Sequence, residues 1–323
     1  MSSSSFSLLR LPTLPLAEIL QLTELKEQCK LSFCSKQMYC IVKHFRGKST
    51  VSLKLSDVGA DINICLLNEK CPDDEVTFKV KRHYEINRFG WETYKTHGNM
   101  SFSKNPDLFI SFSEHVVQET ITLVEHLCDL FTARVKKVEI SNYKIWMLDI
   151  VEERQGAFSY DAEIWNIDNR TDEQLRHILL DLNPRSLDID HKASEQFRIE
   201  NFHKKYNNLT ISAGKWVTIE NIYQLDCVEL KIHGRYYSNS EVNLYLKHVL
   251  RGGAPRLRKF FAEVQNANED AILDGIQELW TGMELVEGGG NWHVNGTVAR
   301  EEGLVEVSIM HLFADISLEI KEI

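Results

Sequence analysis

The chain has 323 residues, with 37 Lys and Arg against 47 Asp and Glu, so its formal net charge at pH 7 is -10. That balance argues against sequence-independent binding of nucleic acid, because contact with a phosphate backbone requires a basic face. Hydrophobic residues make up 43% and charged residues 26%, which is typical of a globular protein with a sizeable core. We therefore expect a folded chain of two domains, or one long domain, with no nucleic-acid partner.

Cysteine usage and the N-terminal segment indicate the compartment. The seven cysteines are an odd number, scattered along a chain long enough to fold without disulfides, and this predicts reduced thiols. The apolar stretch Phe6–Leu22 is interrupted by charged residues and two prolines, so it resembles neither a signal peptide nor a membrane span. We expect a cytoplasmic or nuclear location and no membrane association.

Two motifs invite a catalytic interpretation, and both fail on spacing. Gly47-Lys48-Ser49-Thr50 resembles the end of a phosphate-binding loop, but Val42 stands where that loop needs its first glycine. Cys29, Cys34 and Cys40 lack the two-residue spacing with which a pair of thiolates holds zinc. We therefore expect no catalytic residues, no metal and no cofactor, although an unrecognised enzyme that uses carboxylates on a strand face stays an open hypothesis.

In chain order, the first predicted elements are helical. Apolar residues are dense from Ser7 to His44 and predict two or three short helices, one over Pro15–Leu22 and the next beginning near Thr23. The two prolines fit a first helical turn, where a missing N–H costs nothing. So short a segment cannot bury this much apolar surface alone, so it needs a partner in the same chain or in another.

The rest of the chain predicts strands and then a repeating unit. Residues 48–114 contain alternating runs such as Thr50–Leu55, which predict half-buried strands. From His115 onward helices alternate with strands, which we expect to be centred near residues 138, 164, 188, 211, 230 and 260. Their spacing falls largely in the range of about 20–29 residues that leucine-rich repeats show. We predict an α/β fold in which an N-terminal helical module precedes an irregular leucine-rich-repeat-like α/β solenoid; a doubly wound sheet is the alternative.

The later strands alternate between apolar and polar residues, which places the polar ones on one accessible face. Repeat proteins usually bind another macromolecule on such a face. The candidate target-binding residues are Glu139, Asp188, Thr210, Glu229 and Lys231.

The N-terminal segment resembles a known family. Leu11-Pro12, then Ile19-Leu20, then Leu31-Ser32-Phe33-Cys34-Ser35-Lys36 follow the pattern of an F-box at the same intervals. The chain departs from that pattern at Thr23, Glu24 and Leu25, where a Leu and then Asp-Pro are usual, and at Gln28, where an apolar residue is common. The resemblance implies binding to a Skp-type adaptor and, through a cullin, to a ubiquitin ligase. The adaptor-binding residues that it implies are Leu11, Pro12, Leu16, Ile19, Leu20, Leu31 and Cys34. An ordinary helical cap on the following domain is the alternative.

A second resemblance covers about residues 200–265. Its segments are Lys205–Ile211, Trp216-Val217, Leu225–Leu230, Asn243–His248 and Pro255–Leu257. They are similar to the type-2 F-box-associated domain of the expanded nematode F-box families. Together the resemblances imply three parts: an F-box at 7–47, a connecting β-containing region at 48–114, and an F-box-associated, leucine-rich-repeat-like substrate-binding domain at 115–323. The implied function is the substrate-recognition subunit of an SCF-type E3 ubiquitin ligase, not an enzyme itself; the alternative is a non-catalytic interaction scaffold without ligase attachment.

Overall fold

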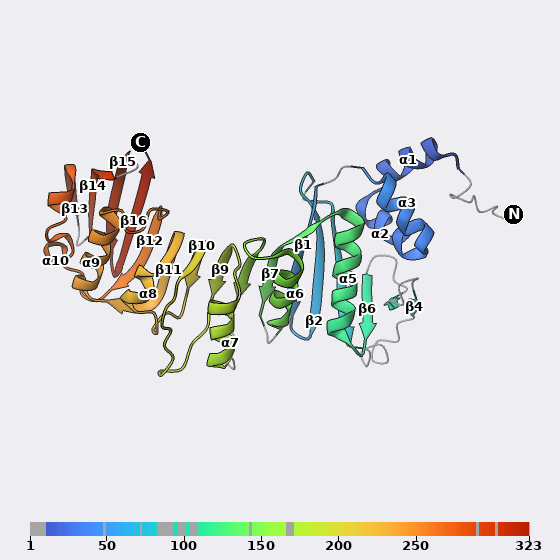
Figure 1. The fold of residues 1–323 in the computed structure, drawn as a ribbon, viewed down its shortest axis with the longest axis horizontal. Coiled ribbons are helices and arrows are strands. Elements are labelled where there is room, and N and C mark those ends of the chain that lie inside the picture. Colours follow the sequence, from blue (N-terminus) through green and yellow to red (C-terminus); the bar gives the residue numbers. More distant parts are fainter. Residues whose placement is uncertain are drawn as a thin grey trace. The chain divides into compact units, whose positions relative to one another are not determined.

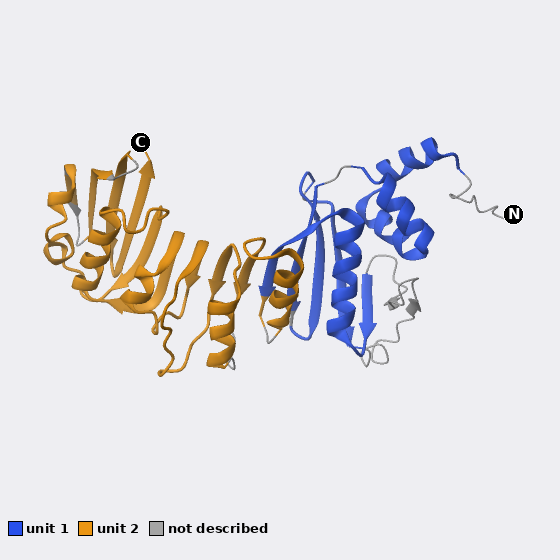
Figure 2. Cartoon of the chain, viewed as in Figure 1, with its two compact units in different colours: residues 1–139 blue, residues 140–323 orange. Residues whose placement is uncertain are grey.

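The structure, a computed structural model, describes residues 11–47, 50–71, 73–82, 93–95, 101–103, 109–141, 144–165, 171–288, 291–300 and 303–322. The chain divides into two compact units, unit 1 at residues 1–139 and unit 2 at residues 140–323 (Figure 2). This boundary differs from the one predicted after residue 114. The reason is that helix α5 (Val116–Phe131) packs on the earlier strands, and strand β7 (Arg134–Ile140) pairs with the first strand of the chain.

Three short helices begin unit 1: α1 (Thr13–Leu22), α2 (Leu25–Cys34) and α3 (Lys36–Phe45) (Figure 1). Pro12 precedes α1 and Pro15 lies in its first turn, where no backbone N–H is needed. The Ser35 hydroxyl begins α3 by accepting a hydrogen bond from the N–H of Met38 at 3.1 Å. These helices confirm the predicted N-terminal helical module.

A mixed sheet follows in unit 1. Its strands are β1 (Val51–Val58), β2 (Asp61–Asn68), β3 (Glu75–Arg82), β4 (Thr93–Lys95), β5 (Ser101–Ser103), β6 (Phe109–Ser113) and β7. They lie in the order β7-β1-β2-β3-β6-β5-β4. Successive pairs from β1 to β3 are antiparallel, whereas β7 is parallel to β1 and β6 is parallel to β3. Alternate residues of β3 are buried, as expected of a half-buried strand, whereas β1, which covers the predicted run Thr50–Leu55, is buried on both faces and so differs from the prediction.

The first helices pack against the rest of unit 1. The Phe33 ring of α2 stacks on the His126 ring of α5 at 4.5 Å between centroids and meets Phe78 of β3 edge-on at 6.0 Å. The Lys43 ammonium of α3 lies 2.6 Å from the Asp129 carboxylate of α5. Part of the apolar surface that needed a partner is therefore covered by the same chain.

Unit 2 begins with strands and helices in alternation. In chain order they are α6 (Trp146–Gln155), β8 (Asp161–Ile164), α7 (Asp172–Arg176), the π-helix η2 (His177–Asp181), β9 (Ser186–Ile189), β10 (Lys204–Ile211), α8 (Ile219–Tyr223), β11 (Leu225–Tyr237), α9 (Asn239–Leu250), β12 (Lys259–Val264) and α10 (Glu269–Leu273). Strands β8 to β12 are parallel neighbours in sequence order. This confirms the predicted alternation, but a parallel series does not by itself identify leucine-rich repeats.

The last part of unit 2 differs from the prediction. After the 3-10 helix η3 (Gln277–Leu279) come β13 (Thr281–Gly288), β14 (Asn291–Arg300), β15 (Gly303–Leu312) and β16 (Asp315–Glu322). All four are antiparallel to their neighbours, and β16 pairs antiparallel with β12. The solenoid predicted through residue 323 does not extend to these strands, because strands joined by short turns run antiparallel and need no crossover helix.

The unit 2 sheet has one apolar face. Ile164, Ile189, Ile211 and Ile232 lie side by side on neighbouring strands and are all buried. Helix α9 covers this face at β12, where its Tyr245 ring lies 4.6 Å from the ring of Phe260, itself on the apolar face. The opposite face of β9, β10 and β11 carries polar residues such as Asp188, Thr210 and Lys231. Among the described residues, no helix is both long and apolar enough to span a membrane.

Candidate functional site

Helix α1 exposes three large apolar side chains. Leu14 is 78%, Ile19 43% and Leu22 87% exposed. Ile19 and Leu22 are three residues apart and so lie on the same side of the helix. We call these three residues the α1 apolar surface. Because such side chains gain free energy when they leave water, this surface is suited to contact with another protein.

The structure separates the seven predicted adaptor-binding residues into two groups. Pro12, Ile19 and Cys34 are exposed, and Leu11 and Leu31 are partly exposed. Leu16 and Leu20, by contrast, are buried among the three helices. Contact with a partner in this arrangement therefore falls to Leu14 and Leu22 instead, which the sequence interpretation left out. The helical stripe revealed which residues are apolar, but only the packing of α1 shows which of them are hidden.

Two residues that depart from the F-box pattern have internal roles. The Gln28 amide is buried, and its Nε2 donates to the Thr23 carbonyl at 2.8 Å and the Leu20 carbonyl at 3.2 Å. The Thr23 hydroxyl donates to the carbonyl of Ile19 at 2.7 Å. These bonds satisfy the carbonyl groups at the end of α1, which would otherwise have no partner. The departures thus stabilise the turn between α1 and α2.

The open face of the unit 2 sheet gathers four of the five predicted target-binding residues. Asp188, Thr210 and Lys231 lie opposite one another on β9, β10 and β11, and Glu229 lies on the same face two residues before Lys231. The shared face was predicted from alternation and is confirmed. Glu139 lies on β7 in unit 1, where its carboxylate meets the ammonium groups of Lys54 and Lys137 at 2.7 and 3.0 Å.

Charge is unevenly distributed over this open face. At the β8–β9 end, burial raises the pKa of Asp188, and the nearby carboxylates of Glu163 and Asp190 raise it further. At the other end, strands β11, β12 and β16 present three lysines, which are Lys231, Lys259 and Lys321. The face therefore carries clustered carboxylates at one end, and three lysines interspersed with glutamates at the other.

A cavity of about 540 Å³ lies on the part of the face that carries the lysines, over β11, β12 and the antiparallel strands. Its polar lining includes the three lysines together with His293, Asn295, Glu306, Ser308, Ser317 and Glu319, and its apolar lining includes Phe261 and Met310. The ammonium groups of Lys259 and Lys321 lie 3.6 and 4.0 Å from the two oxygens of the Glu319 carboxylate. We call this hollow the open-face cavity.

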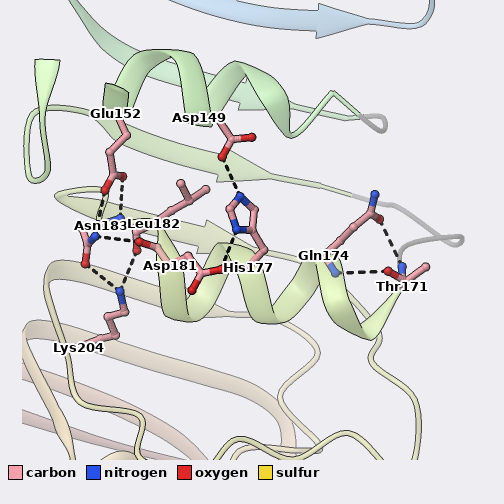
Figure 3. A network of polar contacts seen from close by, with 9 residues as sticks. All are labelled: Asp149, Glu152, Thr171, Gln174, His177, Asp181, Leu182, Asn183 and Lys204. Carbon is pink, nitrogen blue, oxygen red and sulfur yellow. Dashed lines mark hydrogen bonds and ion pairs between the residues drawn. The ribbon is translucent and has the colours of Figure 1, made fainter. Parts of the chain in front are cut away.

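A separate polar network joins α6 to the π-helix (Figure 3). The His177 ring nitrogens lie 2.7 Å from the Asp149 carboxylate and 2.9 Å from that of Asp181. A neutral imidazole carries a single N–H, so donation to both carboxylates requires the protonated ring. Burial lowers the pKa of His177, but the hydrogen bonds and charges of Asp181 and Asp149 outweigh it and raise the pKa overall.

The same network continues through Glu152. Its carboxylate accepts from the Asn183 backbone N–H at 2.7 Å and side-chain amide at 2.9 Å, and from the Tyr160 hydroxyl at 2.9 Å. The Lys204 ammonium donates to the Asn183 side chain at 2.8 Å. These bonds tie α6 to β10 and to the loop before β9, so we assign the network a structural role. Sequence reasoning missed it, although the four-residue spacing of His177 and Asp181 in a predicted helix was a signal.

Two further observations concern metal binding and thiol reactivity. The described parts of the chain contain no group of three or more His, Cys, Asp or Glu side chains that could hold a metal ion. Burial raises the pKa of Cys227 to about 12, and the Asp226 carboxylate contributes, so this thiol is a poor nucleophile. The α1 apolar surface and the open-face cavity are suited to protein contact.

Two protein families match segments of the chain. The F-box domain family matches residues 8–50, which contain α1, α2 and α3. The F-box associated family matches residues 196–261, which run from before β10 into β12. No curated protein and no solved structure matches the chain significantly. The chain thus contains an F-box domain, which implies the role of a substrate adaptor in an SCF-type ubiquitin ligase, and an F-box-associated domain within unit 2.

Proposed function

We propose that this chain is the substrate-recognition subunit of an SCF-type E3 ubiquitin ligase. The α1 apolar surface binds a Skp-type adaptor, the adaptor connects the chain to a cullin, and the open face of unit 2 binds a target protein. The observation that carries the proposal is the exposure of Leu14, Ile19 and Leu22 within the segment that matches the F-box family.

The energetic argument concerns the area that α1 leaves in water. Full burial of one Leu or Ile side chain contributes about 1.5–3 kcal/mol, so three such side chains can supply the core of a stable contact. The same side chains are a liability in a free chain, because exposed apolar patches promote association. Binding to a partner explains why the three residues of the α1 apolar surface are exposed while Leu16 and Leu20 are buried.

In this function the chain performs no bond chemistry. Other subunits carry the activated ubiquitin, and this chain raises the effective concentration of the target near them. The function belongs to the cytoplasm or nucleus, a location supported by the odd number and the scatter of the seven cysteines, which predict reduced thiols.

The test replaces exposed apolar residues of α1 with acids. We expect the double variant Ile19→Asp and Leu22→Asp to reduce recovery of the Skp-type adaptor and cullin by about tenfold or more, because the carboxylates would be buried unpaired in the contact. Leu244→Asp is the matched control, since Leu244 is 57% exposed and lies on α9 in unit 2. Leu20 is unsuitable because it is fully buried, so its replacement would disrupt the helices themselves.

Thermal unfolding of each variant separates lost binding from lost structure. Undiminished recovery of the adaptor with a folded double variant would disprove the proposed attachment. That result would leave the alternative function, a non-catalytic interaction scaffold without a ligase.

A further inference from the structure

The open-face cavity carries an inference about the kind of target segment that binds there. The inference rests on the proposed function and specifies the chemistry of the target, which neither family match supplies. It starts from a contrast of charge: the protein has a net charge of -10, yet the cavity lining carries three lysines and one histidine against two glutamates.

The lysines are incompletely neutralised. Glu319 lies between Lys259 and Lys321 and is the shared partner of both. Lys231 is exposed, and among the described residues its ammonium has no carboxylate within 4.0 Å; the residues opposite it on the sheet are Thr210 and Phe261. Lys259 also faces Glu229 across β11 and β12, so Lys231 is the lysine whose positive charge is least neutralised and can meet a carboxylate from outside.

The floor of the cavity provides an apolar site beside that charge. Phe261, Ser317 and Met310 lie opposite one another on β12, β16 and β15. The small Ser317 side chain leaves a hollow between the two larger apolar ones, whose strands lie about 10 Å apart. An aliphatic side chain fits such a gap and would cover Met310, which is 37% exposed.

The acidic end of the open face supplies a third point of recognition. Asp188 lies in the same cross-strand row as Lys231 and Phe261, three strands away from Phe261. Three strand spacings amount to about 14 Å, which an extended peptide covers in about four residues.

We propose that the open-face cavity binds an extended target segment that carries an apolar side chain, an adjacent acidic side chain, and a basic side chain about four residues away. The apolar side chain packs between Phe261 and Met310. The acidic side chain meets Lys231 and Lys259, and the basic side chain lies over Asp188.

The test uses the full chain and fluorescent synthetic peptides. The probe is an extended serine- and threonine-rich peptide that carries Leu and Glu side by side and Lys about four residues away. Three matched probes replace the Glu by Lys, the Leu by Ser, or the Lys by Glu. We expect fluorescence anisotropy to show the first probe binding at least about tenfold more tightly than each of the other three.

Charge reversals in the protein sharpen the test. Lys259→Glu should weaken binding of the first probe and strengthen binding of the probe with Lys in place of Glu. Lys231→Glu repeats this at the other lysine that the acidic side chain meets, and Lys192→Glu is the control, because Lys192 is exposed and lies outside the cavity lining. Asp188→Lys should shift preference toward the probe whose Lys is replaced by Glu.

Equal binding of the four probes, absence of binding, or affinities unchanged by both lysine reversals in folded protein would overturn the inference. Recovery of the Skp-type adaptor is measured in parallel and should be unaffected by the reversals. A failure of the peptide result with the adaptor retained therefore removes only this inference. If the wild-type chain itself does not bind the adaptor, the proposed function is disproved.

Discussion

The charges beside the open-face cavity of unit 2 are paired more loosely than two ion pairs on the strands of unit 1. In unit 1, Glu139 lies 2.7 Å from Lys54 and Asp61 lies 2.8 Å from Lys81. In unit 2, Glu319 meets two lysines only at 3.6 and 4.0 Å. Close pairing inside a chain satisfies its charges and leaves little for a partner, whereas loose pairing leaves charge available. The comparison indicates that the unit 1 face stabilises its own fold and that the unit 2 face is suited to binding.

A second contrast concerns the aromatic rings. Phe33 is buried where α2 meets α5 and β3, and its ring contacts Phe78 and His126. Phe313 follows β15 in unit 2 and is 88% exposed. The first ring joins the helices of the F-box match to a sheet, and the second contributes little to the core.

The largest effect is expected for Phe33→Ala. Removing this ring leaves a cavity between α2 and the sheet of unit 1 and should cost about 3–5 kcal/mol of unfolding free energy. Phe313→Ala should change stability by at most about 0.5 kcal/mol. Urea unfolding of both variants measures the difference. Equal losses would contradict the view that the F-box helices share a core with the rest of unit 1.

An intermediate effect is expected when charges on the two faces are reversed. Burial raises the pKa of Glu139, but hydrogen bonds from Lys54 and Lys137 outweigh it and hold the pKa below its usual value. Glu139→Lys should therefore destabilise the protein by roughly 1 kcal/mol, an effect that salt reduces.

Glu229→Lys is the matched reversal on the unit 2 face. It should change stability by less than about 0.5 kcal/mol while it strengthens capture of a target whose acidic side chain enters the cavity, because it removes the carboxylate opposite Lys259. Thermal unfolding at low and high salt, combined with pull-down from cells, compares the two variants. If Glu139→Lys weakened capture and Glu229→Lys destabilised the fold, the contrast between the two faces would be reversed.

The smallest effect is expected for pH. The pKa of His177 is raised in the folded chain, so its bonds to Asp149 and Asp181 contribute fully below the unfolded value of about 6.5. The contribution is lost as pH rises through the folded pKa. Because the ring is partly exposed, we expect less than about 1 kcal/mol.

His177→Gln should remove this pH dependence, since glutamine does not titrate. The measurement is the unfolding midpoint of the wild type and the variant from about pH 5 to pH 9, a range that brackets the ordinary histidine value. Parallel pH profiles for the two proteins would show that the imidazolium contributes nothing to stability.

Sequence reasoning succeeded where structure is local. Strands β7 to β12 follow from short alternating runs between helical segments, and all six were predicted near their observed positions. The adaptor-binding residues were harder to assign. Leu20 and Leu22 are both apolar residues of α1, yet one is fully buried and the other 87% exposed, because the packing of α2 and α3 decides which side of α1 is hidden.

The antiparallel end of the chain was missed for a different reason. Val305, Val307 and Ile309 alternate with exposed or partly exposed residues, and the same period recurs over β16. This alternation was available in the sequence, but pairing among strands from distant segments depends on the whole sheet. The open-face cavity could not be predicted from the sequence for the same reason, because its lining residues come from five strands.

The end of the F-box-associated match at residue 261 has an evolutionary consequence. That match contains the lysine of β11 and the first residues of β12, whereas the rest of the cavity wall comes from β14 to β16, beyond it. Mutation in these hairpins can alter the wall without touching the matched segment or the F-box. If the proposed function holds, changes confined to the last strands of the chain would alter what the protein captures and leave the F-box unchanged.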